Sequence, residues 1–199
     1  QGVQTKKDEI RKTILEAAQK EFLIHGYEGA SMRTIAKKAN TTLGNIYHYY
    51  ENKEAILEEL LREPVEKVKK MIDDHVKLQD DLYTMAEMQE LLGDLDNLMD
   101  YHEMQCLLDE RLVILFDLRT THFVKIRDDA IHKFKQHLAW HLGMDDDDSA
   151  YVDIIMNTFI ACVRHVLSEH KGTEESKKEF IKVFKVLCAG VMSNRKEEE

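Results

Sequence analysis

The sequence predicts an all-α protein with an N-terminal three-helix domain, residues 1–53, and a larger helical domain, residues 54–199. Apolar residues recur at three- and four-residue intervals over most of the chain, which is the period of an amphipathic helix. The chain also has one proline and eight glycines, so it contains few of the turns that bound short strands. Period and composition therefore favour helices throughout.

The N-terminal domain is expected to contain two short helices joined by a tight turn. A first helix is expected over residues 8–25, ending at Gly26. Ser31 and Thr42 are expected to cap the next two helices, because their hydroxyls can accept a free amide hydrogen. Asn40 suits the turn between them, since asparagine tolerates a left-handed backbone. Helix, short turn and helix form a helix-turn-helix motif, whose second helix lies in the DNA major groove.

The rest of the chain is expected to consist of longer helices. Asn52 can cap a fourth helix, which Pro64 should kink or break because proline removes an amide hydrogen. Further helices are expected from residue 65, from residue 80, within 95–116, and over 120–142, 151–167 and 174–192. No apolar run approaches the roughly 18 residues of a membrane span, so no membrane partner is expected. Three distant cysteines and the lack of a signal sequence fit the cytoplasm.

The charge is divided unequally along the chain. The net charge is −10, yet residues 1–53 carry nine Lys/Arg and six Asp/Glu. The basic excess thus accompanies the helix-turn-helix, as phosphate binding requires, and the acidic remainder is expected to face away from DNA. Base contacts are expected from the start of the second motif helix, and phosphate contacts from nearby polar side chains. The predicted DNA-binding residues are Arg33, Lys37, Thr42, Leu43, Gly44, Asn45, Tyr47, His48 and Lys53.

The same region resembles the DNA-binding domain of TetR-type transcriptional regulators. The resemblance is carried by Phe22, Gly26 and Tyr27, the runs SMRTIAKKA and GNIYHYY, and NKE at residues 52–54. The glycine, the apolar residue and the phenylalanine usual at three positions of the family are Asn40, Thr41 and Tyr50 here. The resemblance implies a dimeric regulator, most often a repressor, that binds double-stranded DNA and is released by a small-molecule effector.

The last two predicted helices carry more apolar surface than one contact face needs. A helix that is apolar around most of its circumference is buried on two sides, which favours a two-fold four-helix bundle between two chains. TetR-like regulators dimerise in this manner, so the pattern and the resemblance agree. The predicted homodimer interface comprises Ile155, Phe159, Cys162, Val166, Phe180, Phe184, Leu187 and Val191.

An effector cavity is expected between the middle helices, where methionines and aromatic residues gather. The alternative for such residues is an ordinary core, and the resemblance favours the cavity. The predicted lining is Tyr83, Met88, Tyr101, Phe116 and Phe123. His137 and His141 lie four residues apart, a spacing that suits a metal, but the sequence supplies no third ligand, so no metal and no cofactor are predicted.

Three functions follow from the sequence, in order of preference. The first is a ligand-responsive regulator that binds a palindromic operator as a homodimer. The second is a sensor or scaffold that binds a metal or a protein partner, with DNA binding secondary. An enzyme is the third and is not expected, because no nucleophile–base pair, phosphate-binding glycine loop or metal-plus-base motif is visible.

Overall fold

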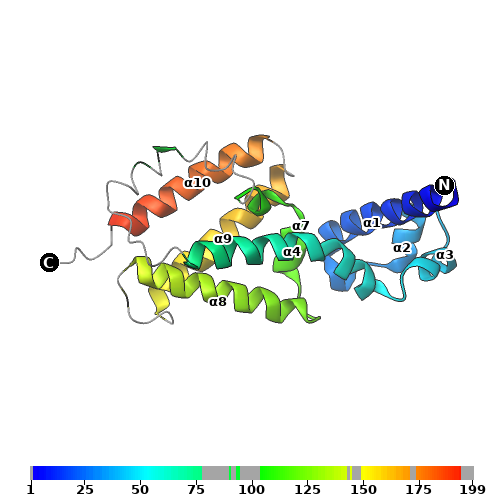
Figure 1. Ribbon diagram of the computed structural model, residues 1–199, viewed down its shortest axis with the longest axis horizontal. Coiled ribbons are helices and arrows are strands. Elements are labelled where there is room, and N and C mark those ends of the chain that lie inside the picture. Colours follow the sequence, from blue (N-terminus) through cyan, green and yellow to red (C-terminus); the bar gives the residue numbers. More distant parts are fainter. Residues whose placement is uncertain are drawn as a thin grey trace. The chain divides into compact units, whose positions relative to one another are not determined.

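The computed structural model describes residues 2–77, 90, 93–94, 104–142, 144, 149–170 and 174–193. Every regular element among these residues is a helix, which confirms the predicted all-α class (Figure 1). The chain folds as two compact units. The first consists of Gln1–Val65 and Arg111–Val124, and the second of Glu66–Glu110 and Lys125–Glu199.

The first unit is built around α1. Its helices are α1 (Gly2–Gly29), α2 (Met32–Lys38), α3 (Leu43–Tyr49), α7 (Arg111–Asp117) and the first part of α4 (Lys53–Lys77). The pairs α1 and α2, α1 and α7, and α2 and α3 are in contact. The core residues are fully buried, and they include Ile14, Phe22, Ile35, Ile46, Ile56 and Leu57. Gly26 interrupts α1 with a φ of 69°, a backbone conformation that side chains disfavour. The predicted end of this helix therefore appears as a break within it.

Pro64 does not break α4, contrary to one of the two outcomes expected for it. The helix continues from Lys53 to Lys77 with Pro64 inside it. Its first part, through Val65, belongs to the first unit, and Glu66 begins the second. The proline thus lies within one position of the residue at which the chain passes between the units.

A segment distant in sequence completes the first unit. Glu28 Oε1 accepts hydrogen bonds from the backbone amides of Arg119, at 2.9 Å, and Thr120, at 3.1 Å. Burial opposes ionisation, but these bonds and one from the Thr120 hydroxyl hold the pKa of Glu28 below its ordinary value. The expected division of the chain after residue 53 therefore falls inside a compact unit, which also includes α7 and the residues after it.

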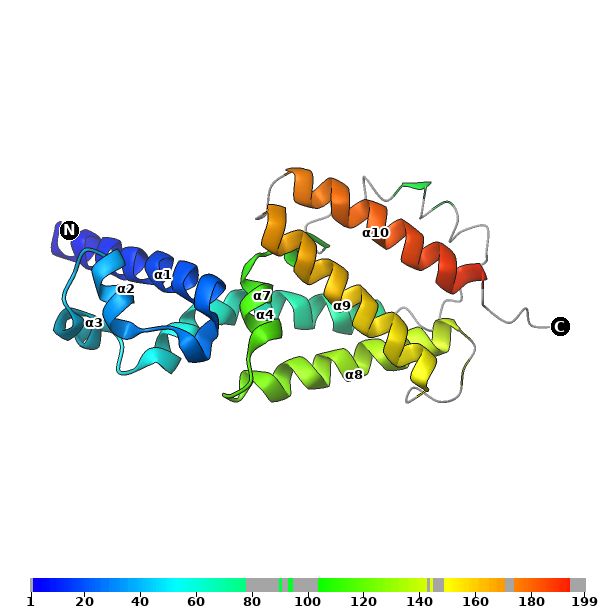
Figure 2. The same ribbon diagram turned by 180° about the vertical axis from the view of Figure 1, so that it is seen from behind.

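The second unit contains a 3-10 helix (Met104–Leu108), the remainder of α4, most of α8 (Phe123–His141), α9 (Ala150–His170) and α10 (Glu174–Ser193). Lys133 on α8 pairs with Asp73 on α4 at 2.7 Å, and Lys135 on α8 pairs with Asp153 on α9. Figure 2 shows α9 and α10 as an antiparallel pair. Phe159 on α9 lies 6.2 Å from the Phe180 ring and 5.9 Å from the Phe184 ring, both on α10.

One helix is long and apolar enough to cross a membrane, which corrects the expectation that no segment would be. This segment is Ala150–Glu169, with a mean hydropathy of 1.3. Length and composition alone give this result, and a core or interface helix has the same character. The physical reason is that apolar residues cover much of the circumference of α9.

Candidate nucleic-acid interface

The turn between α2 and α3 has the geometry that its sequence predicts. Asn40 adopts a φ of 51°, in the left-handed region. Thr42 has an extended backbone, and its Oγ1 accepts a hydrogen bond from the Asn45 amide at 3.1 Å. Ser31 caps α2 in the same way, at a longer distance of 3.5 Å from the Thr34 amide. These caps satisfy free amides at both helix starts and fix α2 and α3 beside one another (Figure 1).

The inner and outer faces of α3 differ sharply. Ile46 is fully buried, and Tyr50, at the end of the helix, is almost so. The outer residues Thr42, Gly44 and His48 are exposed, and Tyr47 keeps half of its surface. A Cβ placed on Gly44 would meet no atom within 4 Å, so the unit's own packing does not require glycine there. The outer face of α3 is thus open to a partner.

Asn45 is half-buried, and one of its amide hydrogens is already hydrogen-bonded within the motif. Its Nδ2 donates a hydrogen bond to Thr41 Oγ1 at 2.7 Å. Thr41 stands where TetR-type regulators usually have an apolar residue, and here its hydroxyl orients the asparagine. An asparagine amide has two hydrogens and an acceptor oxygen, so one hydrogen and the oxygen remain for a base edge. Leu43, also half-buried, precedes it on the same helix.

Two basic side chains of α2 are available to phosphates. Arg33 and Lys37 are exposed, and neither forms an ion pair within the part of the chain that the structure describes. Lys38 differs, because its Nζ lies 2.7 Å from Oε2 of the buried Glu21. Lys38 therefore serves the fold, whereas Arg33 and Lys37 carry unneutralised charge on the motif.

Lys53 has a different position from the one that a phosphate contact suggests. Its Nζ donates hydrogen bonds to the backbone oxygens of Tyr27, Glu28 and Ala30, at 2.7, 3.3 and 3.1 Å. It also lies 4.6 Å from the centre of the Tyr27 ring. Burial lowers the pKa of Lys53, against the charge of Glu28. An ammonium group has three donors, and all three are used within the unit. The sequence does not reveal this role, because the acceptors lie at the end of α1 and just after it, more than 20 residues before Lys53.

Glu21 is a structural residue that sequence reasoning missed. Only 2 % of its surface is exposed, and its carboxylate bonds Lys38 and the backbone amide of Ser31. Burial raises its pKa, but the hydrogen bonds and the charge of Lys38 outweigh burial and hold the pKa below its ordinary value. The carboxylate joins α1 to both ends of α2 and so fixes the helix that presents Arg33 and Lys37. Its only sequence signal is a glutamate on the apolar side of α1.

The predicted effector lining is divided. Tyr83, Met88 and Tyr101 lie outside the described residues, and Phe116 and Phe123 belong to the first unit, where Phe123 is buried. His137 is buried and its ring stacks on Trp140, with centroids 5.7 Å apart. The side chain of His141 lies outside the described residues.

The predicted interface residues also differ in exposure. Val166 and Phe180 are buried within the single chain, so their side chains are not free to meet a partner. Ile155, Phe159, Cys162, Phe184 and Leu187 are half-buried, and the side chain of Val191 is not described. Ile154 and Val186, which the prediction omitted, are 62 % and 73 % exposed. Amphipathic spacing identified the two helices correctly. It could not distinguish the side chains that pack between α9 and α10 from the side chains on the outer surface of the pair.

The comparisons with known proteins agree with this motif. Residues 14–60 match the profile of the family described as bacterial regulatory proteins, tetR family. The chain is 38 % identical over 64 residues to YhgD of Bacillus subtilis, an uncharacterised HTH-type transcriptional regulator. That match covers 32 % of this chain and 34 % of YhgD. The match to a second B. subtilis relative, YdgC, covers 33 % of that protein, so the chain spans about a third of the length of these two relatives.

Two longer matches extend beyond the motif. The HTH-type transcriptional repressor AcnR of Corynebacterium diphtheriae is 27 % identical over 167 residues, which cover 76 % of this chain and 79 % of AcnR. An alanine-substituted mutant of HlyIIR has a similar structure, with a TM-score of 0.52 at 16 % identity, over 96 % of this chain and 97 % of that chain. This second likeness concerns the fold alone. The helix-turn-helix of this chain thus lies within the segment, residues 14–60, that is similar to bacterial regulatory proteins of the tetR family.

Proposed function

We propose that this regulator binds a palindromic operator as a homodimer, represses transcription there, and is released by a small-molecule effector. The observation that carries the proposal is the open outer face of α3 beside the two unpaired basic residues of α2. Thr42 and Asn45, at the start of α3, supply polar groups for base edges, and Gly44 leaves room for close approach to DNA. Arg33 and Lys37 supply the phosphate contacts that set the register without reading sequence. Repression is proposed because AcnR, the longest curated match described above, is named a repressor.

The homodimer is supported by the apolar surface of α9 and α10. Within the apolar part of α9, 28 % of the residues are buried in the single chain. Ile154 and Val186 remain largely exposed, and burying them against a partner would be favourable. A second copy of the same helix pair would bury them in a four-helix bundle. A palindromic site follows, because a two-fold dimer presents two α3 helices about 34–36 Å apart.

Effector release requires that the second unit bind a small molecule differently in two conformations. A difference of about 100-fold in affinity corresponds to a coupling of about 3 kcal/mol, enough to weaken an operator complex substantially. Tyr83, Met88 and Tyr101 stay the proposed contacts of that molecule. The cytoplasm is the proposed location, since the operator is there.

The test is selection of binding sites from random DNA duplexes at low salt, with the full chain. A two-fold symmetric sequence should be enriched. Asn45→Ala should then weaken binding to that sequence by about 1–3 kcal/mol and relax the preference at one position in each half-site. Asp129→Asn, at an exposed position of α8, is the control and should leave binding unchanged. Enrichment of no symmetric sequence would contradict the proposal.

A further inference from the structure

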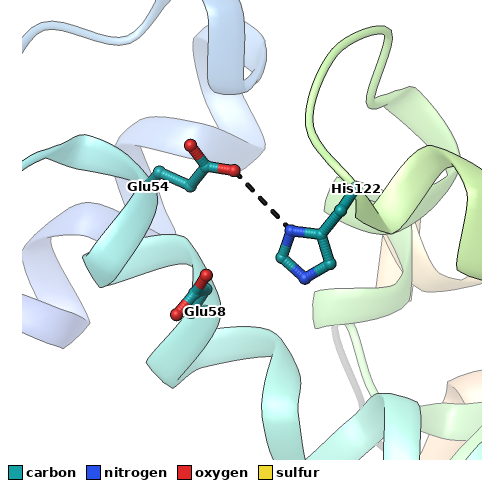
Figure 3. A group of neighbouring side chains, drawn as sticks. All are labelled: Glu54, Glu58 and His122. Carbon is teal, nitrogen blue, oxygen red and sulfur yellow. Dashed lines mark ion pairs between the residues drawn. The ribbon is translucent and has the colours of Figure 1, made fainter.

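Three side chains that can ligate a metal meet in the first unit, and none of them belongs to α3. Glu54 and Glu58 project from successive turns at the start of α4, and His122 comes from the segment between α7 and α8 (Figure 3). His122 Nδ1 lies 3.7 Å from Glu54 Oε1. One ligand atom from each residue lies within 4.8 Å of the others. Among the residues that the structure describes, this is the group with such geometry.

The separations are close to those that a bound cation needs. Three atoms 4.8 Å apart would each lie about 2.8 Å from their common centre, whereas zinc bonds to nitrogen and oxygen are about 2.0–2.2 Å long. Side-chain rotations that move each ligand atom by less than about 1 Å would therefore complete three bonds to the cation. Glu58 and His122 are exposed and Glu54 is half-buried, so the side chains have room to rotate and water can fill the remaining positions.

The local charge also favours a cation. Glu54 and Glu58 are four residues apart on one helix, an arrangement in which two carboxylates repel. The neighbouring ammonium of Lys53 is directed to the backbone oxygens of Tyr27, Glu28 and Ala30. Within the described residues the Glu58 carboxylate has no hydrogen-bond or ion-pair partner, and the ion pair of Glu54 is with His122, whose imidazole is charged only when protonated. A divalent cation would neutralise both carboxylates at once.

We propose that Glu54, Glu58 and His122 form a binding site for a divalent transition-metal cation of the Zn²⁺ type. The imidazole nitrogen distinguishes this class from Mg²⁺ and Ca²⁺, which prefer oxygen ligands alone. The cation joins the first two turns of α4 to the segment that Glu28 already holds through Arg119 and Thr120. It therefore cross-links, within the first unit, the start of α4 and the residues that lead into α8.

The experiment is a titration of the full chain, freed of metal by chelator dialysis, with Zn²⁺ by calorimetry and with Co²⁺ by visible absorption. His122→Gln and Glu58→Gln remove one ligand each while keeping similar size. His165→Gln and Glu51→Gln are matched controls, since both residues are exposed and lie outside the group. Circular dichroism verifies that all four variants are folded.

The wild type and both controls should bind one more equivalent of Zn²⁺ than His122→Gln, or bind it about 10-fold or more tightly. Glu58→Gln should weaken the same equivalent, and the Co²⁺ absorption should change in both ligand variants. Zn²⁺ should also raise the unfolding temperature of the wild type more than that of His122→Gln. Identical Zn²⁺ titrations for wild type and His122→Gln would contradict the proposed site. The metal would then bind at other histidines or would not bind at all. None of these readouts involves DNA, so the result is independent of the proposed operator binding.

Discussion

The Arg111 guanidinium donates a hydrogen bond to the backbone oxygen of Leu60, at 3.2 Å, the acceptor that Pro64 leaves without its helical partner. In an α-helix this oxygen would bond the amide four residues later, and proline has no amide hydrogen. Arg111 also lies 3.1 Å from a Glu63 carboxylate oxygen. A side chain from α7 thus replaces the missing bond, and α4 passes through Pro64 without ending.

This relationship predicts that Arg111 and Pro64 are energetically coupled. Arg111→Met should lower the free energy of unfolding by about 1–3 kcal/mol, because the Leu60 oxygen loses its donor. In a Pro64→Ala background the loss should be smaller, since the new amide hydrogen bonds the same oxygen. Urea unfolding of the four proteins measures this coupling, expected at about 0.5–3 kcal/mol. Strictly additive changes would show that the Leu60 oxygen does not mediate it, and Arg62→Met, an exposed arginine on α4, controls for lost charge.

Gly44 should separate stability from DNA binding. A Cβ at this position meets no atom of the unit, and alanine favours a helix over glycine by up to about 1 kcal/mol. Gly44→Ala should therefore unfold at an equal or higher urea concentration, yet bind the selected operator more weakly because the methyl group occupies the space of close approach. Gly29→Ala, at the end of α1, is the control and should not alter binding. Unchanged affinity in Gly44→Ala would place DNA elsewhere than against α3.

The basic residues should divide into two classes when binding is measured against salt. Arg33→Met and Lys37→Met should each reduce the slope of log affinity against log salt by about 0.9, the value for one phosphate contact. Lys53→Met should instead destabilise the first unit, because the backbone oxygens of Tyr27, Glu28 and Ala30 lose their donor. Fluorescence anisotropy over a salt series, beside urea unfolding, distinguishes them. A reduced slope with unchanged stability in Lys53→Met would restore it as a phosphate ligand.

Local chemistry explains which parts of this fold the sequence predicts. The left-handed turn at Asn40 and the caps of Thr42 and Asn52 depend on residues within a few positions, and all three are observed. The placement of α7 could not be predicted, because it depends on Glu28 meeting Arg119 and on Arg111 meeting Leu60. Both contacts join residues far apart in sequence, and no periodicity encodes them.

The candidate metal group illustrates the same limit. The four-residue spacing of Glu54 and Glu58 is visible in the sequence, but such pairs are common on solvated helices. His122 joins them only because the segment after α7 folds against α4 in the first unit. The histidine pair that the spacing did single out, His137 and His141, includes a buried residue whose ring packs on Trp140.

Glu21 should make the stability of the first unit depend on acid. Its folded pKa lies below the ordinary value of 4.5, so the carboxylate stabilises the folded state above that pH. This contribution is lost as the pH falls from about 4.5 through the folded pKa. Urea midpoints measured between neutral pH and the acid range should fall more steeply for wild type than for Glu21→Gln, which should be less stable at neutral pH. Glu51→Gln, an exposed control, should follow the wild type. Parallel curves of urea midpoint against pH for wild type and Glu21→Gln would show that Glu21 does not cause the loss of stability in acid.

The helix pair α9 and α10 should distinguish interface residues from core residues. Ile154→Asp and Val186→Asp should each give folded monomers, because both side chains are largely exposed in the single chain and a buried unpaired carboxylate opposes association. Phe180→Ala should instead lower the free energy of unfolding by about 3–5 kcal/mol, since this ring is 2 % exposed and stacks on Phe184 at 5.7 Å. Sedimentation at micromolar concentration and urea unfolding give the two readouts. Lys178→Asp, a charge change at an exposed position of α10, should remain dimeric. A wild-type chain that sediments as a monomer would contradict the interface, and the exposed apolar side chains of α9 and α10 would then need another partner.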